Sequence, residues 1–164
     1  MHIVSVSITK TIFPIFWMVL LLTSFSNNIS GQTSSDSAMI VQLLQKEAVT
    51  WRAGDRDGHA ECWQERPYSR ILLSTSAGTF LDIPVSVIIN PSEDIFGKGG
   101  TAFLSNFKMS IHGDEAWVSH DELSVAQDGS ETYSKEIRIL EKINMQWKLV
   151  GQSIHQYLPP SAQK

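Results

Sequence analysis

The chain has 164 residues, 42% of them hydrophobic and 18% charged, a composition that excludes wholesale disorder and fits one globular domain. Its net charge is −4, from 13 Lys and Arg against 17 Asp and Glu, so we expect no nucleic-acid partner, because such proteins usually carry a basic excess. The single cysteine, Cys62, excludes an internal disulfide and a cysteine-rich metal site, and we expect neither a metal ion nor another cofactor.

The first 31 residues differ in composition from the rest. Lys10 is the only charged residue before Asp36, and residues 12–22 are nearly all apolar. This apolar run is about half the length of a membrane-spanning helix, and small polar residues follow it, so the pattern predicts a signal peptide over residues 1–31. We therefore expect a secreted or periplasmic protein that has no membrane attachment after cleavage. An uncleaved anchor helix is the alternative.

The expected organisation after cleavage is one domain. Residues 32–37 form a polar linker, residues 38–158 the domain and residues 159–164 a tail. Enough chain remains for one hydrophobic core but not for two.

Two helices are expected at the start of the domain. From residue 37 to residue 53 the apolar residues recur at helical spacing, as Ile40, Leu43, Leu44, Ala48 and Trp51. Gly54 ends this helix, and Asp55 or Asp57 can cap a second, short helix over residues 58–64.

The middle of the chain gives weaker patterns. Residues 68–75 predict a strand, and a turn follows at residues 76–78. Residues 83–89 fit a strand by propensity and a short third helix by spacing, and both remain open. Residues 96–100 form a glycine-rich loop that contains Lys98, but the residue order of a phosphate-binding loop is absent, so we reject that function.

The last third of the chain predicts antiparallel strands joined by short turns. A two-residue turn at Asn144 and Met145 and a five-residue loop at residues 126–130 connect the last three strands. The expected strands are residues 106–111, 115–125, 132–142 and 146–158.

The turn lengths fix a strand register. The five-residue loop places His120 opposite Glu136 and Val118 opposite Arg138. In an antiparallel hairpin with a two-residue turn, the numbers of two opposed residues have a constant sum. The expected pairs are Leu140 with Leu149, Arg138 with Gly151, Glu136 with Ser153 and Ser134 with His155. A slip of one residue would exchange the two faces of the sheet.

One sheet face in this register is polar at one end and suits the lining of a pocket. The predicted ligand-binding residues are Arg138, Glu136, His120, Glu122, Ser153 and His155, with Trp63 and Tyr68 as aromatic wall. Arg138 offers a fork for a ligand carboxylate, or it forms a structural pair with a glutamate. The candidates for catalytic proton transfer are His120, His155 and Glu136, and histidines at a pocket rim without chemistry are the alternative.

The opposite sheet face carries a block of apolar residues. An exposed block of this kind usually marks an interface, so we expect a homodimer through Trp117, Ile137, Ile139, Val150 and Ile154. The alternative is that the chain's own helices cover this face.

The order of these elements resembles the nuclear transport factor 2-like superfamily, and in particular its SnoaL-like members. The residues that carry the resemblance are 51–55 (WRAGD) with Cys62-Trp63, 113–118 (GDEAWV), and 138–142 (RILEK) running into 146–150 (QWKLV). The resemblance implies an α+β, cystatin-like cone, in which a strongly curved, mostly antiparallel sheet wraps around two to three N-terminal helices. It also implies a small, mostly apolar molecule bound inside the cone and dimers formed through the outer sheet face.

The expected function is therefore a secreted protein that binds a small organic ligand in a polar-lined pocket. One alternative is an enzyme of the lyase or isomerase type that uses a pocket histidine and a carboxylate for proton transfer. The other is a non-catalytic, dimeric interaction module.

Overall fold

A computed structural model describes the backbone of residues 29–159 and the side chains of residues 35–159. Three helices and six strands follow one another as α1 (Ile29–Ala53), α2 (Arg56–Ala60), β1 (Ile71–Ser74), β2 (Phe80–Ile83), α3 (Val85–Ile89), β3 (Thr101–His112), β4 (Glu115–Val125), β5 (Glu131–Ile143) and β6 (Gln146–Tyr157). Most of the predicted signal peptide and tail lie outside the described residues. The expected linker, residues 32–37, lies within α1. None of the helices described is long and apolar enough to span a bilayer.

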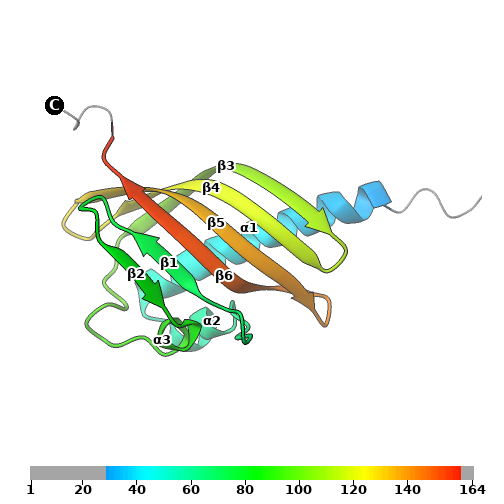
Figure 1. Ribbon diagram of the computed structural model, residues 1–164, viewed down its shortest axis with the longest axis horizontal. Helices are drawn as coiled ribbons and strands as arrows, with labels where there is room; N and C mark the ends of the chain where they lie inside the picture. Colours follow the sequence, from blue (N-terminus) through cyan, green and yellow to red (C-terminus); the bar gives the residue numbers. More distant parts are fainter. Residues whose placement is uncertain (1–28, 160–164) are drawn as a thin grey trace, which may run out of the picture.

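The six strands form one sheet in the order β2-β1-β6-β5-β4-β3. Only β1 and β6 run parallel, and every other neighbouring pair is antiparallel. The long strands curve, and α1 crosses one face of the sheet, which we call the inner face (Figure 1). The predicted α+β fold, with a mostly antiparallel sheet around N-terminal helices, is confirmed.

Helix α1 packs on the sheet through an apolar stripe that is interrupted by charged residues. Ile40 and Leu44 of the predicted stripe are fully buried in the core. Asp36 accepts hydrogen bonds from Lys142 and from the indole nitrogen of Trp147, which ties the N-terminal half of α1 to β5 and β6. Buried ion pairs are costly unless their geometry is good, so such contacts specify how the helix lies rather than simply adding stability.

The glycine-rich loop before β3 caps the C-terminal end of α1. The backbone nitrogens of Gly97 and Gly99 donate to the carbonyls of Trp51 and Arg52, which have no partner within the helix. Gly54 and Gly97 both have positive φ, and a Cβ on Gly97 would lie 2.9 Å from the Cα of Gly54. The glycines of this loop therefore serve the close approach of two chain segments, which agrees with the rejection of a phosphate loop.

The segment between α2 and β3 differs most from the sequence prediction. The predicted strand over residues 68–75 is shorter, at Ile71–Ser74, and residues 83–89 contain helix α3. Strand β2 was not predicted, since most of its residues are exposed and its sequence shows no apolar alternation. Gly78, with φ of 83°, joins β1 and β2 in a hairpin at the edge of the sheet.

The register of β4 and β5 is as predicted, with His120 opposite Glu136 and Val118 opposite Arg138. Asn144 and Met145 both have positive φ, as a two-residue type I′ turn requires, and Leu140 lies opposite Leu149.

A β-bulge at Val150 then shifts the pairing of β5 and β6 by one residue. Ile139 pairs with Gly151 and Arg138 with Gln152, so the predicted pairs of Arg138 with Gly151, Glu136 with Ser153 and Ser134 with His155 are wrong. Beyond the bulge, every side chain of β6 therefore lies on the face opposite to the one that the turn arithmetic predicts. The side chains of Gln152, Ile154 and Gln156 lie on the inner face.

Candidate functional site

A cavity of about 450 Å³ lies between α1 and the inner face of the sheet. Its polar lining comes from α1, β4, β5 and β6, and its apolar lining mostly from the β1–β2 hairpin, α3, the loop after α3 and β6, with a smaller part from α1. The polar residues are Glu47, Arg52, Glu122, Ser124, Thr132, Ser134, Glu136, Arg138, Gln152 and Gln156; most of the apolar ones are Ile71, Leu73, Leu81, Ile83, Ile88, Ile95 and Ile154. A volume of this size accommodates a small organic molecule.

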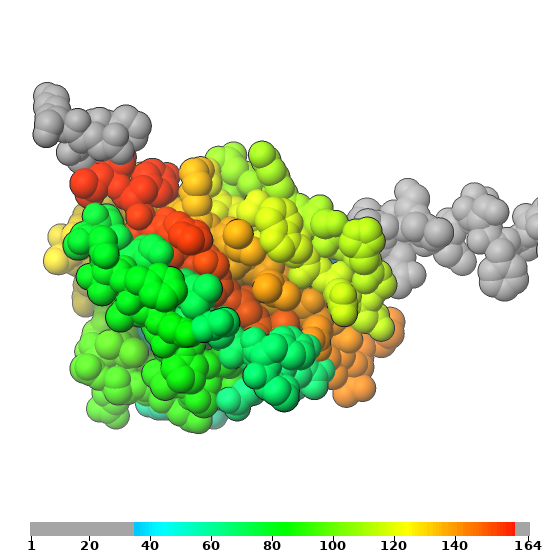
Figure 2. Space-filling view, in the orientation of Figure 1, coloured from blue at the N-terminus to red at the C-terminus, as the bar shows by residue number. Residues whose placement is uncertain are grey.

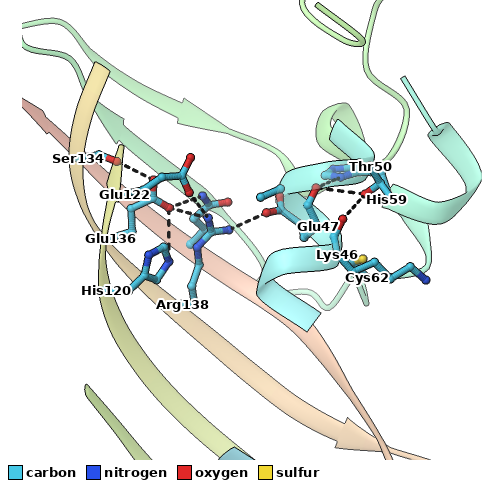
Figure 3. A network of polar contacts seen from close by, with 12 residues as sticks. Lys46, Glu47, Thr50, His59, Cys62, His120, Glu122, Ser134, Glu136 and Arg138 are labelled. Carbon is cyan, nitrogen blue, oxygen red and sulfur yellow. Dashed lines mark hydrogen bonds and ion pairs between the residues drawn. The ribbon is translucent and has the colours of Figure 1, made fainter. Parts of the chain in front are cut away.

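Arg138 of β5 is the centre of a buried charge cluster on this cavity. Its residue surface is only 2% exposed, and its two terminal nitrogens contact three carboxylates. The distance from Nη2 is 2.6 Å to Glu136 Oε2 and 4.0 Å to Glu122 Oε2, and from Nη1 it is 3.4 Å to Glu47 Oε2. Figure 3 shows the guanidinium group between the strand carboxylates and Glu47 of α1.

Glu122 of β4 connects this cluster to a second arginine. Arg52, in the last turn of α1, donates from Nη2 to Glu122 Oε1 at 2.8 Å and contacts the Ser124 hydroxyl. The Ser124 hydroxyl also donates to Glu122 Oε1. Oε1 therefore has two donors, whereas Oε2 has only the distant Arg138 nitrogen among the described residues.

Glu136 of β5 is the best satisfied of the three carboxylates. Oε1 accepts a hydrogen bond from the Ser134 hydroxyl, and Oε2 accepts one from the Gln152 amide. Burial alone would raise the pKa of Glu136, but the charge of Arg138 and these hydrogen bonds lower it. Glu136 is therefore held as the carboxylate.

His120 of β4 lies behind Glu136 and against the ring of Phe107. Its Nε2 is 3.9 Å from Glu136 Oε2 and has no hydrogen-bond partner among the described residues. Burial, and next the charge of Arg138, lower the pKa of His120, so the neutral imidazole is favoured at neutral pH. His120 does not line the cavity and is not placed to contact a ligand there.

Glu47 of α1 is the least satisfied carboxylate of the cluster. It is 7% exposed, and the one hydrogen bond of its carboxylate to the described residues, from Arg138 Nη1, is 3.4 Å long. Its main-chain carbonyl is held by the Thr50 hydroxyl and lies 3.4 Å from His59 Nδ1, so the helix turn that carries Glu47 is fixed. Burial raises the pKa of Glu47 to about 7, because Arg138 only partly offsets the desolvation and Glu136 and Glu122 oppose ionisation.

The structure brings four of the predicted ligand-binding residues, Arg138, Glu136, Glu122 and His120, into one cluster and places the other four outside it. The three predicted catalytic candidates, His120, His155 and Glu136, all border a separate hollow on the outer face. Because of the bulge, Ser153 and His155 lie on the outer face, where the Ser153 hydroxyl is 2.9 Å from His155 Nε2. Their predicted place on the inner face is wrong.

The two predicted aromatic wall residues, Trp63 and Tyr68, also lie away from the cavity. Trp63 is buried in the hydrophobic core and makes an isolated bridge to Leu149. Tyr68 is 63% exposed, and its hydroxyl donates to Glu141 on the other side of the sheet. Neither ring belongs to the lining of the cavity.

The outer face of the sheet carries part of the predicted interface. Trp117 and Ile139 are 43% and 50% exposed, and Ile137 lies beside them. Among the described elements no helix covers this face of β4, β5 and β6 (Figure 2). Val150 lines a hollow with Trp117 and Ile139, as predicted, but is itself only 2% exposed. The predicted place of Ile154 is wrong, because it lines the inner cavity.

Sequence reasoning missed Glu47 and Arg52 and expected Gln152 on the outer face. The sequence does carry a signal for Glu47, which follows Ile40 and Leu44 at the spacing of the buried stripe. A glutamate at such a position is rarely buried without a partner, so it predicts a polar contact inside the domain.

Other titratable groups near α1 are enclosed by packing. His59 lies among Trp51, Trp63 and Phe96, and burial lowers its pKa to about 4. Cys62 is buried, and burial raises the pKa of its thiol to about 11, which favours the thiol over the thiolate. Within the described part of the chain, no three His, Cys, Asp or Glu side chains are arranged to hold a metal ion.

Solved structures of proteins with little sequence identity share this fold. A protein of unknown function with a cystatin-like fold from Nostoc punctiforme superposes with a TM-score of 0.59 at 18% identity, covering 79% of this chain and 96% of its own. An NTF2-like protein with a cystatin-like fold from Novosphingobium aromaticivorans gives 0.59 at 15% identity, covering 83% and 94%. A candidate dehydratase of the NTF2-like family from Streptomyces avermitilis gives 0.57 at 14%, covering 77% and 99%. No family model matches the sequence, and no curated protein matches it.

Proposed function

We propose that this chain, which has the cystatin-like fold of the NTF2-like proteins, binds a small, mostly apolar molecule in the cavity beneath α1. The resemblance to this superfamily that the sequence indicates is confirmed at the level of the fold. Proteins of one fold have many functions, so the proposal depends on the site itself.

The observation that carries the proposal is a buried charge cluster that opens onto a cavity with an apolar wall. Arg138 and the three carboxylates are almost fully buried, and burying charges costs free energy that an apolar core would not. Packing alone does not need such a cluster at this position. Polar groups on one side of a cavity and an apolar wall on the other suit a site that orients a small ligand.

The first prediction concerns filling of the cavity. Ile154→Trp places an indole in the cavity, whereas Ile139→Trp makes the same change on the outer face. We expect the full chain to bind one molecule of the neutral fluorescent probe N-phenyl-1-naphthylamine. The Ile154 variant should weaken this binding by about tenfold or more, and the Ile139 variant should leave it unchanged. Fluorescence titration measures both.

Native mass spectrometry of the purified chain provides a second readout for the same proposal, because a retained ligand appears as added mass. Equal probe binding in the two tryptophan variants would place the probe outside the cavity. That result, together with no retained mass, would contradict the proposed function.

A second candidate function is an enzyme of the lyase or isomerase type. The observation that favours it is that Glu47 and Glu136 share Arg138 while their pKa values are shifted in opposite directions, as in acid–base pairs. A ligand identified by its mass can be incubated with the protein in D2O. Deuterium uptake that Glu47→Gln abolishes would support proton transfer, and the absence of uptake would leave binding alone.

We also propose that the chain is exported and forms a homodimer through the outer face. The leader-like pattern of residues 1–31 supports export. The exposed Trp117 and Ile139, on a hollow sheet face that no described helix covers, support a two-fold interface.

The second prediction tests this interface. Trp117→Glu introduces a charge at the exposed patch, and we expect it to weaken dimerisation by at least about tenfold, because a buried tryptophan commonly contributes most at an interface. Light scattering coupled to size exclusion measures the mass. Val49→Glu, on an exposed apolar position of α1, is the control and should remain dimeric. A monomeric parent protein, or a dimeric Trp117 variant, would refute the proposal.

A further inference from the structure

The charge cluster on the cavity contains one carboxylate more than it contains guanidinium groups. The carboxylate nearest to Arg138 is that of Glu136, at 2.6 Å, and the carboxylate nearest to Arg52 is that of Glu122, at 2.8 Å. These two pairs leave Glu47, whose carboxylate has Arg138, at 3.4 Å, as its one ion-pair partner within the described part of the chain. His120 adds no positive charge, since its pKa is lowered. An almost buried carboxylate is therefore without a counter-charge of its own.

The carboxylates of the cavity wall also have unused acceptor atoms, whereas the one Arg138 donor left unpaired by the described residues, its Nε, is buried. Both terminal nitrogens of Arg138 already face carboxylates, and Arg52 donates to Glu122, Ser124 and the main-chain carbonyl of Ala48. Among the described residues, Glu47 Oε1 and Glu122 Oε2 have no hydrogen-bond donor. An ionised carboxylate accepts only, so a donor that arrives with the ligand can bind to these two atoms.

A ligand carboxylate does not fit this arrangement. It would be the fourth carboxylate around Arg138, and it would have to displace one of the three that the chain supplies. Desolvation of an additional anion beside them would cost free energy that no unused cation returns. The fork of Arg138 thus serves to hold the carboxylates of the site in place.

We propose that the ligand of this cavity is a small amphipathic amine, an inference that rests on the proposed function. Its ammonium group donates to the free oxygens of Glu47 and Glu122, and its hydrocarbon part lies against the apolar wall formed by residues such as Ile83, Ile88 and Ile154. The bound cation completes the charge balance of the cluster, which then has three positive and three negative groups. In the absence of ligand, protonation of Glu47 serves the same purpose.

The experiment compares three probes that have the same rigid hydrocarbon cage and differ only in the polar group: adamantan-1-amine, adamantan-1-ol and adamantane-1-carboxylate. Calorimetry with the full chain at neutral pH measures their affinities. We expect the amine to bind at least about tenfold tighter than the alcohol and the carboxylate to bind weakest, because only the amine supplies the missing charge.

Glu47→Gln should remove most of the difference between amine and alcohol while the alcohol continues to bind. Glu61→Gln, at an exposed carboxylate paired with Lys46 at the end of α2, should leave the difference intact. The ranking of the probes on the unmodified protein needs no variant to fold.

Each other outcome is decisive. Equal binding of the amine and the alcohol, or tighter binding of the carboxylate, would overturn the amine as the ligand class and leave the cavity as a binding site. Failure of all three probes and of N-phenyl-1-naphthylamine would overturn the proposed function as well. If Glu47→Gln leaves the preference for the amine unchanged, the ammonium group binds at another site, and this result would also refute the proposal.

Discussion

Replacing Arg138 by methionine is expected to lower the free energy of unfolding by about 3–5 kcal/mol at neutral pH. Methionine has a similar length but no charge, so the variant leaves Glu136, Glu122 and Glu47 in the interior with Arg52 as the only remaining cation of the cluster. Urea denaturation followed by tryptophan fluorescence measures the change. Because the loss comes from uncompensated carboxylates, it should become smaller as the pH falls and the carboxylates become protonated.

A matched control is available on the edge of the sheet. Arg70 of the segment before β1 pairs with Asp82 of β2, but its side chain is 60% exposed. Arg70→Met should cost less than about 1 kcal/mol, since exposed ion pairs contribute little. Adding Glu136→Gln to the Arg138 variant should restore part of the lost stability, because it removes one of the buried carboxylates that no longer has a counter-charge. A change below about 1 kcal/mol in Arg138→Met, without rescue, would show that water already solvates the cluster.

The part of the site that lies on β4 and β5 could be predicted from the sequence because local turn chemistry determines the register of a hairpin. The loop over residues 126–130 is closed by Gly129, with φ of 83°, and it fixes His120 opposite Glu136. Once this pair is placed, alternation along the strands puts Glu122 and Arg138 on the same face. No knowledge of the tertiary structure is needed for these four residues.

The part of the site on β6 could not be predicted by the same arithmetic, because a bulge adds one residue that a turn does not reveal. The signal lies in the strand itself, where Leu149 and Val150 are both buried and thus break the expected alternation. Counting from the turn without the bulge places Ser153 and His155 on the inner face, whereas the structure has Gln152 and Ile154 there. The chemistry of the predicted pocket changes accordingly, since two histidines on one rim become one buried histidine and an apolar wall.

The contribution of α1 could not be predicted for a different reason. The side chains of Glu47 and Arg138 are separated by 91 positions in the chain and meet only because α1 crosses the sheet at this point. Helical periodicity identifies the buried side of α1, but not which strand lies beneath each turn. The crossing is set by contacts at both ends of the helix, from Asp36 to Lys142 and from Arg52 to Glu122.

Replacing Glu47 by glutamine is expected to stabilise the domain at pH 8 by about 3 kcal/mol and to change little at pH 5. The carboxyl group has a pKa of about 7 in the folded chain and an ordinary value of 4.5 when exposed. Between these two values the folded state binds more protons than the unfolded state, so the contribution of Glu47 to stability falls as the pH rises. Above pH 7 the full cost of the buried charge is present. Glutamine resembles the protonated form at every pH and avoids this cost.

Urea denaturation gives the free energy of unfolding of the parent protein and of the variant across this pH range. The difference between the two values isolates Glu47, because the other titrating groups contribute equally to both. Glu61→Gln is the control, because Glu61 is exposed and its pKa is lowered by Lys46, and its loss should give no gain at pH 8. A Glu47 variant that is less stable than the parent at pH 8 would mean that Arg138 already compensates this carboxylate. The cluster would then have no charge left for a cationic ligand, so this measurement tests the amine proposal without any ligand.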